Sequence, residues 1–150
     1  LLFFTAIGPT HVEISGHPLR PGNQYQVLLS QAGSVSFRRL ELFLELEEQA
    51  TFRQGTDVRT ERQVVWQSLI RRWNNIEPLS GTPFEAEVQL QLPSKAMHSF
   101  SSTHNTVSWR LVLRGVPEHW PALVRVFPVV VFPAEIISID GKKAIVQTRT

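Results

Sequence analysis

The sequence predicts an all-β protein built as an antiparallel β-sandwich, and three observations support this class. Apolar and polar residues alternate over several stretches, which is the period of a strand with one buried and one solvated side. Ten prolines and many other turn residues separate these stretches at short intervals. Strand patterns do not alternate with helix patterns, which argues against a parallel α/β sheet.

The first half of the chain contains two clear strands. The sequence QYQVLLS follows a Pro21-Gly22 turn and is typical of a strand. Residues 40–47 then alternate strictly, with leucine at every even position and Phe43 among three glutamates at the odd positions. We expect the leucines to face the core and the glutamates to form a solvated row on the outer side.

Residues 60–75 carry two conflicting patterns. Thr60 and Gln63 have the spacing of a helical capping box, and four apolar residues from Trp66 to Trp73 recur at helical spacing. The β-branched Val64 and Val65, and the strands expected on both sides, favour an extended conformation. We predict a long strand over residues 61–73, and a helix is the alternative.

The second half repeats the alternation over residues 84–92 and 107–114. An apolar run bracketed by Pro128 and Pro133 predicts another strand at an edge, because proline cannot donate a ladder hydrogen bond. Asp140 and Gly141 stand between two short apolar runs and predict a two-residue hairpin turn. Across the chain, the residues predicted for the centre of the core are Leu42, Leu44, Val88, Leu90, Trp109 and Leu111.

Length and the absence of any internal repeat predict a single domain over residues 1–150. Within it, we assign the core sandwich to about residues 10–133 and the C-terminal hairpin to residues 134–150.

The order of these strands resembles one lobe of the arrestin-fold family. FEAEVQLQLP, a short loop ending in HSF, HNTVSWRLVLRGV and FPVVVFP are similar to the second half of such a lobe. RPGNQYQVLL and RRLELFLELEEQATF resemble its opening strands. The chain has room for one lobe, where arrestins have two, and it lacks a PPxY motif and an obvious match to their phosphate-reading lysines. The resemblance therefore implies a scaffold that binds proteins, and another immunoglobulin-like sandwich is the alternative fold.

Composition argues against several partners. The formal net charge is only +2, and the twelve arginines are spread among acids rather than gathered in a basic block, so we expect no nucleic-acid partner. The chain has no cysteine, which excludes disulfides and thiolate sites.

The histidines do not form a recognisable metal or catalytic motif. His98 and His104 are six residues apart, and no acid lies between Met97 and Gly115, whereas a zinc site needs three or four protein ligands. The chain also lacks a Gly-x-Ser-x-Gly elbow and a glycine-rich phosphate loop. We predict no catalytic residue, no cofactor and no metal, and we interpret Met97–Asn105 as a serine-rich loop that leads into the strand of Trp109.

Protein binding is therefore the predicted function, with this chain as a non-catalytic interaction or scaffold domain. Phe43 and Val112 are both predicted on outer faces, which suggests that a partner covers part of that surface. A protein partner of unknown identity, or a second copy paired through an edge strand or the C-terminal hairpin, would fit such a surface.

A carbohydrate-binding module is the alternative from another class. Trp73 and Trp120 lie in turn-like contexts, WNN and EHWPA, where exposed rings could stack on a sugar. This alternative requires both rings to be exposed and roughly coplanar.

The ends suggest a fragment of a larger protein, or a processed chain, because residue 1 is leucine and the sole methionine is Met97. The sequence LLFF at residues 1–4 is either the first core strand or the end of a membrane segment. Membrane contact is expected only through such a missing N-terminal segment, and the sequence assigns no compartment.

Overall fold

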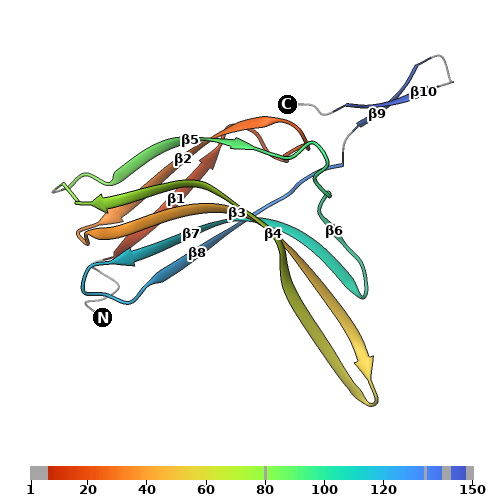
Figure 1. The fold of residues 1–150 in the computed structure, drawn as a ribbon, viewed down its shortest axis with the longest axis horizontal. Coiled ribbons are helices and arrows are strands. Elements are labelled where there is room, and N and C mark those ends of the chain that lie inside the picture. The colour runs from red at the N-terminus through yellow and green to blue at the C-terminus, as the bar shows by residue number, and fades with distance from the viewer. Residues whose placement is uncertain (1–6, 80, 134, 140–142, 148–150) are drawn as a thin grey trace.

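The computed structural model describes residues 7–79, 81–133, 135–139 and 143–147. All the regular secondary structure in these ranges is β-strand (Figure 1). The strands are β1 (Ile7–Ile14), β2 (Gln24–Gly33), β3 (Phe37–Gln54), β4 (Asp57–Ile76), β5 (Phe84–Gln91), β6 (Phe100–Ser101), β7 (Asn105–Pro117), β8 (Leu123–Val129), β9 (Glu135–Ile139) and β10 (Lys143–Gln147).

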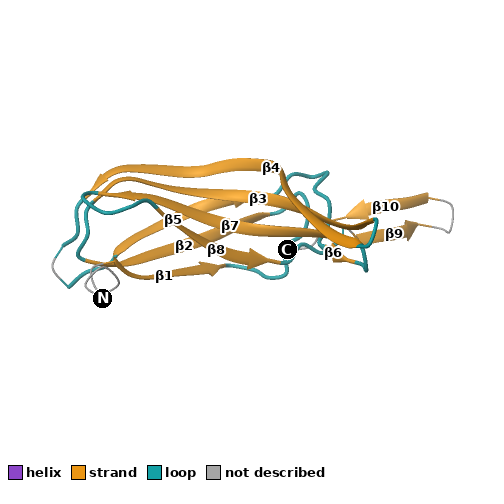
Figure 2. Cartoon of the chain, turned by 90° about the horizontal axis from the view of Figure 1, so that it is seen from below, coloured by secondary structure: helices purple, strands orange, loops and turns teal. Residues whose placement is uncertain are grey.

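Two antiparallel sheets form the two layers of the sandwich (Figure 2). The smaller sheet has the order β1-β2-β5. The larger sheet has the order β4-β3-β7-β6, and β8 also pairs with β7. This arrangement confirms the predicted class, an all-β sandwich.

The core lies where the inner faces of the two sheets meet. The predicted alternation of apolar and polar residues explains which side chains enter it. The even-numbered leucines of β3 are all buried, from Leu40 to Leu46. Each of the six residues predicted for the centre of the core is at most 4% exposed. Trp109 on β7 has its ring 5.6 Å from that of Trp66 on β4, in an edge-to-face arrangement that aromatic pairs prefer.

The loop before β7 has the predicted structural role. The indole Nε1 of Trp109 donates to the carbonyl oxygen of Met97 at 2.6 Å. The hydroxyl of Ser99 accepts a hydrogen bond from the backbone N–H of Val131, and that of Ser102 accepts one from the N–H of Asn105. These serines satisfy backbone groups at the open end of the sandwich, as serine does in irregular segments.

The long strand predicted over residues 61–73 is confirmed, and the helical alternative is wrong. Two shifts of register along β4 each add one residue relative to β3, at Val65 and at Ile70. Such bulges change which residues face inward. Trp66 and Ile70 share a face by alternation, and the bulge at Ile70 places Trp73 on that face too. All three therefore pack against the core, although their spacing is that of a helix.

Two details near the C-terminal end differ from expectation. β8 begins at Leu123 and ends at Val129, so the predicted run between the two prolines is only partly strand. After Val129 the chain leaves the sheet and runs beside Leu19. The backbone N–H of Leu19 donates a hydrogen bond to the carbonyl oxygen of Val130 at 2.8 Å. Val131 is thereby buried under the end of the sandwich.

β9 and β10 form their own antiparallel hairpin. Ile139 pairs with Lys143, which leaves three residues between the paired ends rather than the predicted two. The turn itself, residues 140–142, lies outside the described residues, as do residues 1–4.

Candidate interaction surface

The outer face of the larger sheet carries an apolar row that crosses four strands. Phe43 of β3 pairs with Val112 of β7, as the outer-face prediction requires. Leu69 of β4 flanks Phe43, and Val126 of β8 flanks Val112. Leu69 and Val126 are 44% and 45% exposed, whereas Val112 is only 1% exposed.

Charged side chains of the same molecule cover the middle of this row. The guanidinium of Arg114 lies 5.3 Å from the ring centroid of Phe43, within the range of a cation–π contact. The guanidinium of Arg114 also forms a salt bridge with the carboxylate of Glu45, with a nitrogen–oxygen distance of 3.2 Å. The cover that the sequence led us to expect from a partner is therefore supplied, over Phe43, from within the chain.

Glu45 is the centre of this charged layer, and its side chain is completely buried. One carboxylate oxygen of Glu45 accepts a hydrogen bond from the guanidinium of Arg110 at 3.0 Å. The other oxygen accepts one hydrogen bond from the side-chain amide of Gln67 at 2.6 Å and another from the guanidinium of Arg114 at 3.2 Å. The expectation of a solvated glutamate row is wrong here. Long arginine side chains from the neighbouring strand fold over the carboxylate and exclude water from it.

The two tryptophans proposed for sugar stacking lie against the protein. Trp73 is partly buried on the inner side of β4 and packs against the core. Its ring lies 5.6 Å from that of Phe84, edge-to-face. Trp120 is also partly buried, in the turn between β7 and β8. This burial does not match the exposed pair of ring faces that carbohydrate binding requires.

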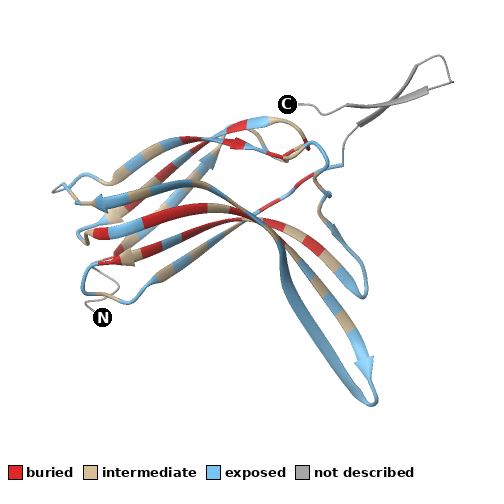
Figure 3. Ribbon diagram, viewed as in Figure 1, coloured by how far each residue is buried: buried red, intermediate tan, exposed pale blue. Residues whose placement is uncertain are grey.

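A long exposed element of the structure is a ribbon that the sequence patterns did not predict as a separate feature. β3 pairs with β7 only as far as Ala50, and beyond that point β3 and β4 continue as a two-stranded hairpin. We call residues 47–64 the β3–β4 arm; at its base residues 47–50 still pair with β7, and residues 51–60 form a ribbon of two strands alone. It projects from the sandwich and is exposed over most of its length (Figures 1 and 3).

The arm ends in a tight two-residue turn. Gln54 pairs with Asp57, and Gly55 between them has a φ of 65°. Glycine adopts this left-handed conformation without strain, and its place as the first turn residue matches a type II′ hairpin. The sequence signal was present as a glycine between two polar stretches of strand character.

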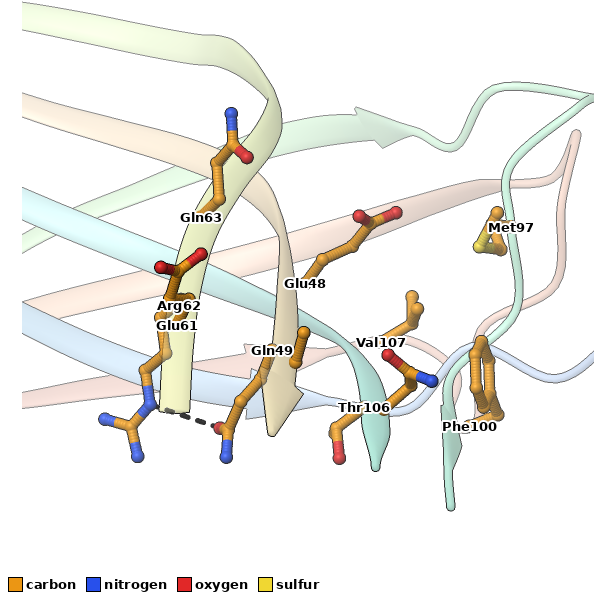
Figure 4. A pocket seen from close by; sticks show the side chains of 11 residues that line it. Glu48, Gln49, Glu61, Arg62, Gln63, Met97, Phe100, Thr106 and Val107 are labelled. Carbon is orange, nitrogen blue, oxygen red and sulfur yellow. Dashed lines mark hydrogen bonds between the residues drawn. The ribbon is translucent and has the colours of Figure 1, made fainter. Parts of the chain in front are cut away.

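A hollow of about 530 Å³ lies where the arm leaves the sandwich. Glu48 and Glu61 line one side of it, and Met97 and Phe100 line the other (Figure 4). Glu48 follows Leu46 by two residues and so continues the inner face of β3. The inner face thus becomes polar at the point where the smaller sheet no longer covers it. No histidine lines this hollow.

Within the part of the chain that the structure describes, no three histidine or acidic side chains come close enough to hold a metal ion. In the same ranges no helix has the length and apolarity to cross a membrane.

Comparison with solved structures supports the predicted arrestin-like β-sandwich as the fold of this chain. No protein-family model matches the sequence, and no curated protein matches it. Among solved structures, the chain is similar to Spo0M, a sporulation control protein from Bacillus subtilis, with a TM-score of 0.57 and 11% identity. The match covers 81% of this chain and 48% of Spo0M, so the chain spans about half the length of that protein.

A second solved structure is a β-glucosidase from Listeria innocua in complex with gluconolactone. It matches with 16% identity over 82% of this chain and 16% of the enzyme. Its TM-score of 0.29 is too low to support an argument. The likeness to Spo0M supports the arrestin-like sandwich fold and does not define an activity.

Proposed function

We propose that this chain is a non-catalytic protein-interaction domain that binds its partner by adding a strand to the free edge of β4 on the β3–β4 arm. The observation that carries the proposal is the uninterrupted edge over residues 57–64. There β4 pairs with β3 residue by residue, and no other described strand lies on its second side. The backbone groups on that side can pair with an extended segment of another chain.

Residues 57–64 of β4 contain no bulge and no proline, the two features that interrupt a ladder of hydrogen bonds, although they do carry charged side chains. The two bulges of β4 lie at Val65 and Ile70, over the sandwich and outside the stretch. A bulge twists an edge and interrupts pairing. The edge is therefore protected along the sandwich and open along the arm.

The other sheet edges are less suited to a partner strand. The edge strand β1 has a register shift between Ile7 and Thr10. β8 contains Pro128, which cannot donate to a ladder. The edge of β5 lies close to the larger sheet, because Phe84 of β5 contacts Trp73 of β4.

The arm is an element that a bound strand would stabilise. A two-stranded ribbon with no layer on either face is only marginally stable in water. Phe52 and Val58 on the arm are 40% and 65% exposed. A partner strand would add ladder hydrogen bonds and cover part of this apolar surface. The likeness to a sporulation control protein is consistent with a regulatory role exerted through binding.

Site-specific photo-cross-linking tests this proposal. A photo-reactive phenylalanine is placed at Val58 on the arm, and as a control at the exposed His11 on β1, in cells that make the full protein. We expect a defined cross-linked protein from Val58 and none from His11. The cross-linked protein is then purified, and its affinity is measured for the wild type and for a chain whose residues 52–59 are replaced by Asn-Gly.

The arm-shortened chain should bind at least ten-fold more weakly. Equal affinity for both chains, or cross-links of equal yield from both positions, would overturn the assignment of the arm as the binding element.

A further inference from the structure

We propose that a strand capable of pairing with the β4 edge is the same segment of a second copy of this chain, with Thr60 on the two-fold axis. The inference rests on the proposed function, because it uses the same edge. It names the partner by the pattern of charges on the arm. The assembly would be a four-stranded antiparallel ribbon in the order β3, β4, β4 of the second copy, β3 of the second copy.

Symmetry limits the possible registers of such a pair. Two identical antiparallel strands in one sheet are related by a two-fold axis perpendicular to the sheet. Such an axis passes between a residue and its own copy, because hydrogen-bonded and non-hydrogen-bonded pairs alternate along an antiparallel ladder. Each register can therefore be identified by the one residue that faces itself.

Two of these registers place unlike charges opposite each other, the one with Thr60 and the one with Val58 on the axis. Because β4 begins at Asp57, the Val58 register would pair only residues 57–59, whereas the Thr60 register pairs residues 57–63. The longer pairing favours Thr60.

Asp57, Arg59 and Glu61 are alternate residues and so share one face of the ribbon. With Thr60 on the axis, Arg59 lies opposite Glu61 of the second copy, and Glu61 lies opposite Arg59 of the second copy. The two directly opposed pairs have opposite charges, which stabilises a strand pair.

The neighbouring registers bring like charges together. With Arg59 on the axis, two arginines face each other and Asp57 lies opposite Glu61 of the second copy. With Glu61 on the axis, two glutamates face each other, and with Arg62 on the axis, two arginines do. Like charges directly opposed in a sheet are destabilising. The alternation of charge therefore disfavours the slipped pairings next to the Thr60 register.

The opposite face of the ribbon fits the same register. The hydroxyls of Thr51 and Thr60 lie 3.2 Å apart across β3 and β4. Pairing at Thr60 would extend this contact into a row of four threonines across four strands, and opposed threonines are favourable cross-strand neighbours. The interface is small, so we expect a reversible, concentration-dependent dimer rather than a permanent one.

Charge reversal tests the proposed register. The association constant is measured by sedimentation equilibrium from about 10 µM to about 1 mM, the range of weak association. We expect R59E alone and E61R alone each to weaken self-association at least ten-fold, because each opposes like charges. The double variant R59E/E61R, and an equimolar mixture of the two single variants, should both restore it. Circular dichroism confirms that each variant retains the fold.

A second measurement does not depend on charge. The chain has no cysteine, so a single introduced thiol reports only its own contacts. T60C should form a disulfide-linked dimer under mild oxidation, because the two thiols face each other across the axis. The control is L79C, at a position 74% exposed and far along the chain from the arm. Cross-linking of T60C no faster than that of L79C would overturn the register.

The outcomes separate this inference from the proposed function. A wild-type chain that sediments as a monomer throughout the range would overturn self-pairing. In that case, a photo-cross-link from Val58 to a different protein would still support strand addition at the arm. Self-association that neither single variant weakens would also overturn the inference, because the copies would meet elsewhere.

Discussion

Glu45 shows how one residue can depart from the pattern of its strand. It occupies an outward position of β3, yet its side chain is completely buried under Arg110, Arg114 and Gln67. A buried carboxylate is tolerated only when charged partners and hydrogen bonds replace its water. Here two guanidinium groups do so while retaining partial contact with solvent themselves. Glu45 and the two arginines thus form a salt-bridge layer over the middle of the outer face of the larger sheet.

Replacing the central carboxylate should measure the strength of this layer. We expect E45Q to lower the free energy of unfolding by about 1–3 kcal/mol, since the hydrogen bonds to charged partners weaken. E47Q is the matched control, because Glu47 is half-buried and has an ion pair with Arg110 at 3.0 Å. That change should cost less than about 1 kcal/mol. Urea unfolding gives both values, and equal losses would contradict the central role of Glu45.

Trp109 is the residue on which the two layers of the core depend most. Its indole is 2% exposed, packs against Trp66 and donates to the carbonyl of Met97. We expect W109A to lower the free energy of unfolding by about 3–5 kcal/mol, because a large cavity remains. W109F keeps part of the volume but loses the hydrogen bond, and should cost clearly less. The idea fails if W109A unfolds at the same urea concentration as the wild type.

At the scale of elements, β4 combines two different tasks in one strand of 20 residues. Along the sandwich Trp66, Ile70 and Trp73 pack against the core, and the bulge at Ile70 brings Trp73 to the same face as the other two. Along the arm its pairing with β3 is regular and its side chains are exposed. The boundary between the two parts coincides with the bulge at Val65.

Shortening the arm should leave the sandwich intact. Thr51 and Thr60 form a direct pair, so replacing residues 52–59 by Asn-Gly closes the hairpin with a favoured turn. The hydrogen bond from the N–H of Thr51 to His104 at 2.8 Å is retained. We expect the free energy of unfolding to change by less than about 1 kcal/mol, as for exposed changes generally. A larger loss in urea unfolding would show that the arm contributes to the core.

At the scale of the whole molecule, the two sheets differ in extent, and this difference produces the exposed features. The inner face of β3 is leucine as far as Leu46, where the smaller sheet still contributes to the core. Glu48 then begins a polar stretch that lines an open hollow. At the same end, the segment from Val130 to Phe132 hydrogen-bonds to Leu19 and closes the sandwich.

The C-terminal hairpin should be dispensable for the stability of the sandwich. In the described ranges β9 and β10 pair with each other and with no strand of the two larger sheets. A chain that ends at residue 134 should therefore keep its midpoint of thermal unfolding within about 2 °C of the full chain, which corresponds to at most about 1 kcal/mol. Differential scanning calorimetry measures this, and a drop of many degrees would place the hairpin in the folded core.

The sequence by itself determined the class of fold and the centre of the core, because the period of two in residues 40–47, 84–92 and 107–114 gathers the apolar side chains on the one face of each strand that packs against the other sheet. It also placed Phe43 and Val112 on the outer face correctly. Local periodicity sufficed for these features, since they depend on neighbours two residues apart.

Only the tertiary structure decided the environment of each outer residue and the course of β4. The burial of Glu45 depends on arginines 65 and 69 residues away in the chain, and no local pattern contains that contact. The inward position of Trp73, three residues after Ile70, depends on the bulge at Ile70 relative to β3, which single-strand periodicity cannot show. The exposure of the β3–β4 arm depends on where β7 and the smaller sheet end, because an identical ribbon would be buried if those elements continued beside it.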